Sequence, residues 1–465
     1  MKNHSRWIAS PEMTLFAGSL RGGISTSFSL TNWFFRSVLR KTVRMIELGI
    51  RRILSLLTSP RVILAFGGFF FRLLGMRKSR QVFNFSQIKR ILILRLDGIG
   101  DVVMNIAFLR ELRQNLPDAW ITLVVKPAVH NLVELCPYVN EVLTYDFNVP
   151  GSSWRWMQHI FKPLSRRGCI LRPAWKCLWR RQFDLAIVPR WSMDYYRAGF
   201  IAYLSGAFWR IGYSENVTDE KRQKNAGFDR WYTHVLTDNN LKNEVEHNLD
   251  VIRSLGGRIQ DERLELWLGK EDEDFADQIM KSYDINLHKH LVAFCPGAGA
   301  PKRMWPLANF IELGDWLIRE YYAHILVVGG QGEESLGQEI QQQLGDKVIN
   351  MVGRATVRQT GALLKHCQLY VGNDTGPMHL AAAAGTPVVE ISCHPRTGSL
   401  VHDNSPKRFG PWGVPNYVLQ PEKAISPCSN ECIAVEAAHC ILNVSVQQVK
   451  KAVEELLHVD IKLAN

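Results

Sequence analysis

The 465-residue sequence lacks several features that would place it in a simple class. It has no run of 18 or more apolar residues, so no segment is predicted to cross a membrane as a helix. Acidic residues are nearly absent from residues 1–90, where only Glu12 and Glu47 accompany 16 Lys and Arg residues. The other 375 residues hold 40 basic and 42 acidic side chains. The net charge of +12 therefore arises in the N-terminal segment, which removes most support for a nucleic-acid-binding protein.

Paired cysteine motifs are also lacking. Nine cysteines are scattered along the chain and no secretory signal precedes them, which predicts reduced thiols in a cytosolic protein. Cys428, Cys432 and Cys440 lie near His439 in the sequence, but their spacing lacks the C-x2-C pairs typical of zinc modules. We therefore expect plain thiols there, rather than a metal ion or a disulfide.

Residues 1–88 form a basic extension, in which residues 33–57 have the pattern of an amphipathic helix. One half of the helical wheel carries basic side chains, at Arg36, Arg40, Lys41, Arg44, Arg51 and Arg52. The other half is apolar, which is typical of helices lying on an anionic membrane surface. Three alternatives are a helix packed on the protein's own core, a transit peptide, and translation starting at Met45 or Met76.

From residue 89 onward, short apolar runs alternate with helical patterns, which predicts parallel sheets with helical crossovers. One such unit covers residues 89–270 and a second covers residues 285–465, with polar residues 257–290 read as the linker. Residues 151–183 interrupt the first unit with eight basic side chains, no acidic one and four tryptophans. This insert is either a basic loop or a second patch facing a membrane or an anionic acceptor.

The first unit contains a glycine-rich turn, Gly98 to Asp101, between a predicted strand and helix. A dinucleotide fingerprint would need glycine at Val103, so an NAD-dependent oxidoreductase is weakly supported. Asp101 falls where doubly wound sheets bind their ligands. It is either a helix cap or a carboxylate able to deprotonate a hydroxyl group.

The second unit has two glycine loops suited to anions. Gly297 and Gly299 follow its first predicted strand, with Lys302 and Arg303 next. A second loop, GNDTGPMH at 372–379, joins a strand to a helix whose N-terminus can bind a diphosphate. An Asx turn with an ordinary helix start is the alternative. Two such loops with nearby cations indicate a phosphate-containing ligand.

These motifs together resemble glycosyltransferase family 9, the ADP-heptose:lipopolysaccharide heptosyltransferases. The resemblance rests on five segments over roughly residues 89–455: RLDGIGDVV at 95–103, WRIGYS at 209–214, PGAGAPKRMWP at 296–306, VVGGQGEE at 327–334 and GNDTGPMHLAAAAGTPVV at 372–389. It implies an α/β GT-B fold, with two Rossmann-like domains facing across a cleft. The first would bind the acceptor and the second the nucleotide sugar.

The resemblance also implies the chemistry: inverting transfer of a heptose-like sugar without a metal or other cofactor. It places the catalytic base at Asp101, a ribose contact at Glu333 and the diphosphate contacts at Asp374, Thr375, Gly376 and His379. The family's donor-binding lysine falls on Arg303, with Lys302 one position earlier, so either cation could meet the phosphate.

The expected partners are a nucleotide-sugar donor, such as ADP-heptose, and a lipid-linked or oligosaccharide acceptor. An anionic membrane surface on the cytoplasmic side is expected as well, and nucleic acid is not. Two alternatives stay open: a GT-B glycosyltransferase using a UDP- or GDP-sugar, and a membrane-attached, non-catalytic nucleotide-sugar-binding protein.

Overall fold

The structure is a computed structural model that describes residues 83–145, 178–285, 290–433 and 436–463. All of them belong to the second of two compact units, Gly68–Asn465. The expected amphipathic helix at 33–57 and most of the basic insert at 151–183 lie outside the described residues. Within the described ranges, no helix is both long and apolar enough to cross a membrane.

The first half of the described chain forms a six-stranded parallel sheet in the order β3-β2-β1-β4-β5-β6. Its strands are β1 (Arg90–Leu94), β2 (Trp120–Val125), β3 (Glu141–Thr144), β4 (Leu185–Val188), β5 (Trp209–Tyr213) and β6 (His234–Leu236). Its helices are α3 (Ile99–Val103), α4 (Ile106–Asn115), α5 (Pro127–Val133), α7 (Ala198–Leu204), α8 (Asp219–Lys224) and α9 (Glu244–Ser254). The central strands β1 and β4 are buried along nearly their whole length, as their continuous apolar runs require.

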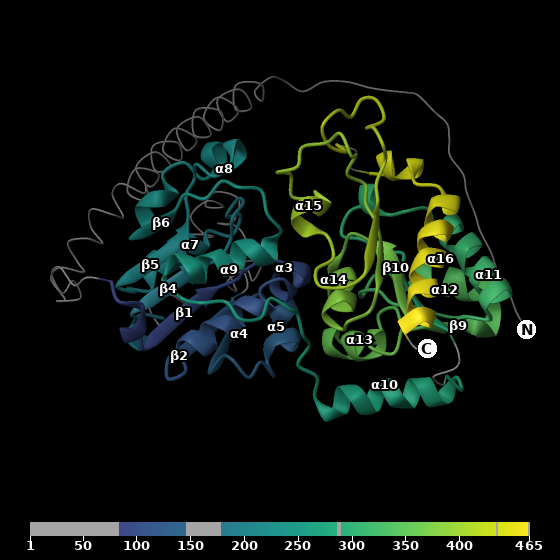
Figure 1. The fold of residues 1–465 in the computed structure, drawn as a ribbon, viewed down its shortest axis with the longest axis horizontal. Helices are drawn as coiled ribbons and strands as arrows, with labels where there is room; N and C mark the ends of the chain where they lie inside the picture. The colour runs from purple at the N-terminus through teal and green to yellow at the C-terminus, as the bar shows by residue number, and fades with distance from the viewer. Residues whose placement is uncertain (1–82, 146–177, 286–289, 434–435, 464–465) are drawn as a thin grey trace, which may run out of the picture. The chain divides into compact units, whose positions relative to one another are not determined.

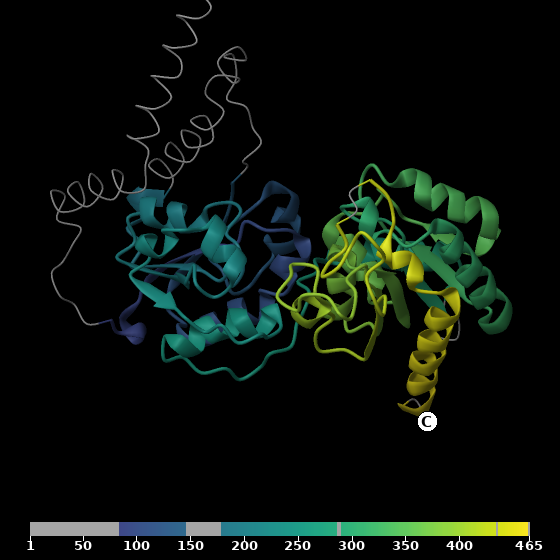
Figure 2. The same cartoon turned by 90° about the horizontal axis from the view of Figure 1, so that it is seen from above.

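The second half repeats this plan with the order β12-β11-β10-β7-β8-β9, again all parallel. Its strands are β7 (Leu291–Cys295), β8 (His324–Val327), β9 (Val348–Asn350), β10 (Leu369–Asn373), β11 (Val388–Ile391) and β12 (Asn416–Leu419). Its helices are α11 (Leu307–Tyr321), α12 (Glu334–Leu344), α13 (Val357–Leu364), α14 (Gly376–Ala383), α15 (Pro406–Phe409) and α16 (Val446–Leu463). The C-terminal helix α16, yellow in Figures 1 and 2, packs on α11.

Both sheets have the strand order of a Rossmann fold, so the predicted two-domain α/β architecture is confirmed. In each sheet the chain reverses its direction of growth between two central strands, β1 and β4 in the first and β7 and β10 in the second. Loops that leave the carboxyl ends of these strands diverge and open a crevice. The glycine-rich loops identified in the sequence follow β1, β7 and β10.

Two local predictions were wrong. The segment read as a polar linker contains a 13-residue helix, α10 (Lys270–Ser282), which packs on α13. Its few buried side chains, Asp272, Ala276 and Met280, recur at every fourth position. The single helix predicted after the Gly98–Asp101 turn is divided, because Met104 and Asn105 separate α3 from α4.

A buried ion pair joins the two halves. The guanidinium of Arg408, at α15, donates from Nε to Glu244 Oε1 at the start of α9, 3.0 Å away. Both side chains are at most 1% exposed. Removing either partner would strand an uncompensated charge in the interior, so this contact fixes the two halves together.

Candidate functional site

A cavity of about 540 Å³ lies where the switch-point loops of the two sheets meet. This size suits a small-molecule ligand. Nine of the ten residues proposed from the sequence line it: Asp101, Gly297, Gly299, Arg303, Glu333, Asp374, Thr375, Gly376 and His379. The strand order explains this, because all nine lie in the loops or the first helical turns that follow β1, β7, β8 and β10.

Asp101 lies in the first turn of α3, and its carboxylate faces both the helix start and two arginines. Its Oδ2 accepts a hydrogen bond from the Gly98 backbone N–H at 3.2 Å. Its Oδ1 lies 3.2 Å from Arg190 Nη1 and 3.5 Å from Arg95 Nη2. The side chain is 22% exposed, so the carboxylate reaches the cavity while it is held in place.

The same neighbours set the charge of Asp101. Burial alone would raise the pKa of its carboxyl group, but Arg190, Arg95 and the Gly98 N–H outweigh burial and lower the pKa. Asp101 is therefore ionised at neutral pH, as a general base must be before it accepts a proton.

Arg190 is a site residue that the sequence reasoning missed. It follows β4, and its Nη1 lies 2.7 Å from Asp97 Oδ1 as well as close to Asp101. The surrounding carboxylates more than offset the effect of burial, so the pKa of Arg190 is raised and its charge is permanent. Its position after a buried strand, at the switch point, was a signal available in the sequence.

Helix α14 points its N-terminus into the cavity. Thr375 occupies the N-cap position, but its side chain makes no capping hydrogen bond and instead donates to the Asn373 carbonyl. Pro377 has no N–H and the Met378 N–H donates to the Thr375 carbonyl, so the Gly376 N–H is the donor at the helix start. This N–H and the helix dipole favour an anion.

α3 and α14 approach so closely that glycine is required between them. A Cβ on Gly100 would lie 2.5 Å from Cδ2 of His379, and a Cβ on Gly376 would lie 3.0 Å from Cβ of Ile99. Burial lowers the pKa of His379 to about 4, although Asp101 opposes this shift. His379 is therefore a neutral hydrogen-bonding group at physiological pH.

Arg303, after β7, and Asp374, after β10, bring a cation and a carboxyl group together at the cavity. Arg303 Nη1 lies 3.3 Å from the Asp374 carbonyl and 3.9 Å from Asp374 Oδ2. Burial raises the pKa of Asp374 to about 6, although Arg303 opposes it. Arg303 thus brings a positive charge into a cavity whose nearest carboxyl group is partly protonated near neutral pH.

Lys302 is the one proposed residue that the structure directs elsewhere. Its Nζ donates to the backbone carbonyl of Cys432 at 2.6 Å, whereas Arg303 lines the cavity. Of the two cations proposed from the sequence, the structure therefore places Arg303 at the cavity and Lys302 outside it.

Glu333, after β8, and Gly297, after β7, lie against each other at another part of the cavity wall. Glu333 Oε2 accepts from the Gly330 N–H at 2.8 Å, and a Cβ on Gly297 would come within 2.3 Å of the Glu333 carboxylate. The missing side chain at Gly297 makes room for this carboxylate at the cavity wall.

Three further cavity residues were not identified from the sequence. Tyr195 donates a hydrogen bond to Asp403 Oδ2 at 2.8 Å, and the ring of Tyr196 lies under Lys126, whose Nζ is 3.5 Å from the ring centroid. Tyr195, Tyr196 and Asp403 lie in loops without a glycine-rich or phosphate-binding pattern, so only the folded structure reveals them. They add aromatic and hydrogen-bonding surface beside Asp101.

Comparison with known proteins agrees with this geometry. The sequence profile of glycosyltransferase family 9 (heptosyltransferase) matches residues 171–434. The lipopolysaccharide heptosyltransferase 2 of Salmonella typhimurium is 24% identical over 317 residues, covering 65% of this chain and 82% of the relative.

Solved structures share the fold. A glycosyl transferase family 9 protein from Veillonella parvula superposes with a TM-score of 0.63 at 20% identity, covering 82% of this chain and 99% of the other. The E. coli heptosyltransferase WaaC with ADP-2-deoxy-2-fluoro heptose gives a TM-score of 0.54 at 16% identity, covering 79% and 99%. With the profile match spanning more than half of its length, the chain belongs to glycosyltransferase family 9, the heptosyltransferases, and is a glycosyltransferase.

Proposed function

We propose that this enzyme transfers a heptose from ADP-heptose to a lipopolysaccharide-core acceptor, with inversion at the anomeric carbon and without a catalytic metal ion. The observation that carries the proposal is the position of Asp101. Its ionised carboxylate lies in the same cavity as the start of α14, so a base and an anion site share one space.

Asp101 is the proposed general base. An acceptor hydroxyl in contact with its carboxylate would give up its proton as the oxygen attacks the anomeric carbon. The bond from that carbon to the diphosphate breaks in the same displacement, which inverts the configuration. Arg190 and Arg95 keep the base charged beforehand and fix its orientation.

The donor is proposed to lie along the second half of the cavity. Gly376, Thr375 and Arg303 would receive the diphosphate, with neutral His379 as a hydrogen-bonding neighbour and Glu333 at the ribose. The departing nucleoside diphosphate gains negative charge as the bond breaks, and the helix start and Arg303 are placed to stabilise that charge. These groups supply the positive potential that a metal ion provides in other transferases.

ADP-heptose is proposed as the donor because the family is that of the heptosyltransferases and because the E. coli neighbour was crystallised with an ADP-heptose analogue. The acceptor is proposed from the Salmonella relative's name, a lipopolysaccharide heptosyltransferase. A lipid-linked acceptor also fits the 16 basic residues of the first 90, which suit a peripheral position on the anionic inner face of the cytoplasmic membrane.

The base is tested by Asp101→Asn, which keeps the size of the side chain and removes its basicity. We expect the rate of heptose transfer to fall by about 10²- to 10⁴-fold, the usual contribution of a general base. ADP affinity, measured by calorimetry, should change little. The control is Asp118→Asn, because Asp118 is exposed in the turn before β2, at the amino ends of the strands, and does not line the cavity.

The donor is tested by comparing ADP-heptose with UDP- and GDP-sugars in the same transfer assay. Faster transfer from a UDP- or GDP-sugar would contradict the donor assignment, and near wild-type transfer by Asp101→Asn would contradict the base. Binding of ADP-heptose without any transfer would indicate the non-catalytic alternative.

A further inference from the structure

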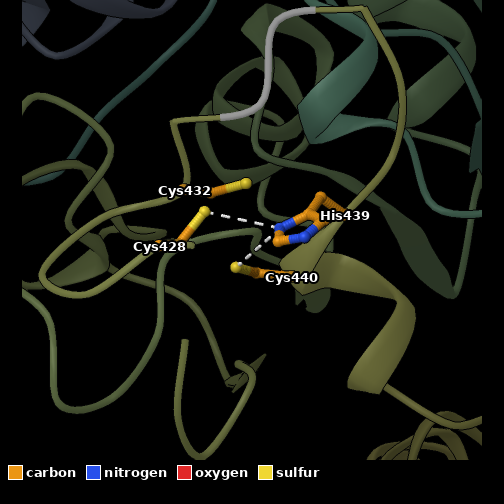
Figure 3. A group of neighbouring side chains, drawn as sticks. All are labelled: Cys428, Cys432, His439 and Cys440. Carbon is orange, nitrogen blue, oxygen red and sulfur yellow. Dashed lines mark hydrogen bonds between the residues drawn. The ribbon is translucent and has the colours of Figure 1, made fainter. Parts of the chain in front are cut away.

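Four side chains with metal-binding chemistry converge outside the cavity. Cys428, Cys432, His439 and Cys440 lie in the segment between β12 and α16, and their ligand atoms are all within 4.8 Å of one another. Figure 3 shows the three sulfur atoms and the imidazole ring pointing toward a common centre. The sequence spacing predicted plain thiols at these positions, but the fold brings them together as a set.

The separations match those around a tetrahedral metal ion. His439 Nδ1 lies 3.4 Å from the Sγ atoms of both Cys428 and Cys440. Metal–sulfur bonds of about 2.3 Å and metal–nitrogen bonds of about 2.0 Å, at tetrahedral angles, place neighbouring ligand atoms roughly 3.5 Å apart. Only a small adjustment would therefore bring all four atoms into one coordination sphere.

Backbone N–H groups point at two of the three sulfur atoms. The backbone N–H of Ile433 donates to Cys428 Sγ at 3.3 Å, and the N–H of Ile425 donates to Cys440 Sγ at 3.4 Å. Donors of this kind orient thiolate ligands and stabilise their charge in metal sites. All three cysteines are buried and His439 is half-buried, so the four residues form a closed set with little room for a substrate.

The segment that holds these residues has little regular secondary structure. In its described residues, 420–433 and 436–445, one short 3-10 helix (Cys440–Asn443) is the sole regular element. Long segments without secondary structure in a compact domain are usually either functional or disordered. A metal ion held by residues 428 to 440 would give this segment a structural role.

The same segment also holds the loop after β7, which carries Arg303. Lys302 Nζ donates to the Cys432 carbonyl at 2.6 Å, and Trp305 Nε1 donates to the Val444 carbonyl at 2.8 Å. Arg303 of the cavity stands between these two anchored residues in the sequence. Fixing residues 428–444 would therefore fix the loop that carries Arg303.

We propose that Cys428, Cys432, His439 and Cys440 form a structural zinc site. Three thiolates and one imidazole around a tetrahedral ion are a standard structural zinc set, in which no position is left open for catalysis. None of the four residues lines the cavity that holds Asp101, so the zinc ion would take no direct part in the reaction proposed above.

The metal is tested on the full-length protein by elemental analysis after purification without chelators. We expect about one zinc ion per chain, and cobalt substitution should give the intense visible and near-ultraviolet bands of a tetrahedral thiolate site. Cys432→Ser and Cys440→Ser should each lose most of the zinc. Cys367→Ser is the matched control, because Cys367 is an equally buried thiol at the end of α13 and should leave the zinc content unchanged.

A second measurement applies even if those variants fail to fold. Wild-type protein treated with a mercurial reagent should release zinc in step with the modification of three thiols, and prior zinc removal should lower its melting temperature. Protein that carries no metal and takes up no cobalt would overturn the proposal, as would a disulfide between any two of the three cysteines in a mass spectrum. Iron in place of zinc would overturn the identity of the ion.

Discussion

Arg190 is the residue on which the proposed chemistry of Asp101 depends. It contacts Asp97 and Asp101 together and, with Arg95, holds the pKa of Asp101 down against the effect of burial. Because Arg190 touches the base and is not itself proposed to exchange a proton, it is a positioning residue. Its effect should appear in the pH dependence of the reaction.

We expect Arg190→Gln to move the acidic limb of the kcat/KM profile to higher pH. Without the guanidinium, the pKa of Asp101 rises, so the base stays protonated, and inactive, up to a higher pH. Arg190→Lys keeps a positive charge and should shift the limb less. An acidic limb at the wild-type position in folded Arg190→Gln protein would contradict this role.

Asp374 leads to a prediction about stability. Its pKa of about 6 in the folded protein is above the ordinary value of 3.8, so folding favours its protonated form. The stability that this group contributes is therefore present at low pH and is lost as pH rises through about 6. Asp374→Asn should gain melting temperature relative to wild type as pH increases from 4 to about 7.

Thermal unfolding across this pH range measures the difference, with Asp346→Asn as the control because Asp346 is exposed. A difference between Asp374→Asn and wild type that stays constant with pH would contradict the raised pKa.

The residues that sequence reasoning located share one property. Gly297, Asp374 and Asp101 follow buried strands and belong to loops with a glycine-rich pattern. Arg190 follows a buried strand too, but a lone arginine has no such pattern. Lys302 is held away from the cavity by the hydrogen bond that it donates to the Cys432 carbonyl, 130 residues away in the chain. The local sequence around Lys302 and Arg303 does not indicate this contact.

At the scale of elements, Arg358 of α13 connects α5 and α10. Its Nε lies 2.7 Å from Asp272 Oδ2, its Nη1 donates to the Asn131 carbonyl at 2.8 Å, and it pairs with Glu134. The Arg358 side chain is only 12% exposed. One guanidinium therefore links the first half, the connecting helix and the second half.

Arg358→Ala should lower the free energy of unfolding by about 1–3 kcal/mol, because it leaves the buried Asp272 carboxylate without its cation. Urea unfolding followed by circular dichroism measures this loss. The comparison is Arg319→Ala, which removes an ion pair with Asp315 from a side chain that is 73% exposed and should cost less than about 0.5 kcal/mol. Equal losses in the two variants would show that Arg358 makes no special connection.

Strands buried on both faces were predictable, whereas two partly exposed elements, β12 and α10, were not. The strands β1, β4, β7 and β10 appear in the sequence as continuous apolar runs. By contrast, β12 is exposed or half-buried along its length, and α10 buries three side chains in thirteen residues, so its composition is that of a linker. Only contacts distant in sequence, such as that of Arg358 with Asp272, hold α10 in place.

For the whole molecule, the net positive charge is concentrated in the N-terminal segment. The first 90 residues carry 16 basic and two acidic side chains, whereas the rest of the chain is nearly neutral. Ile88 is buried in the core and Phe83 packs on Trp209. The proposed membrane-binding segment is therefore best separated from the catalytic body before residue 83.

A variant lacking residues 1–82 should bind vesicles containing anionic lipid far more weakly than the full chain while it retains ADP binding. Each basic residue near such a surface contributes on the order of 1 kcal/mol, so the loss should be large and should shrink at high salt. Vesicle co-sedimentation and calorimetry measure the two properties. Unchanged sedimentation would assign membrane contact to the rest of the chain, and loss of both properties would make the segment part of the fold.

The matching strand orders of the two sheets have a consequence for engineering. Each half completes its own six-stranded sheet from consecutive strands, so a chimeric enzyme could take its nucleotide-sugar half from another family member without dividing a sheet. The constraint lies where the incoming half contacts the rest of the chain. The incoming half must present an arginine to Glu244 and another to Asp272, as Arg408 and Arg358 do here. Recombination at the connecting helix thus becomes a question of matching two ion pairs.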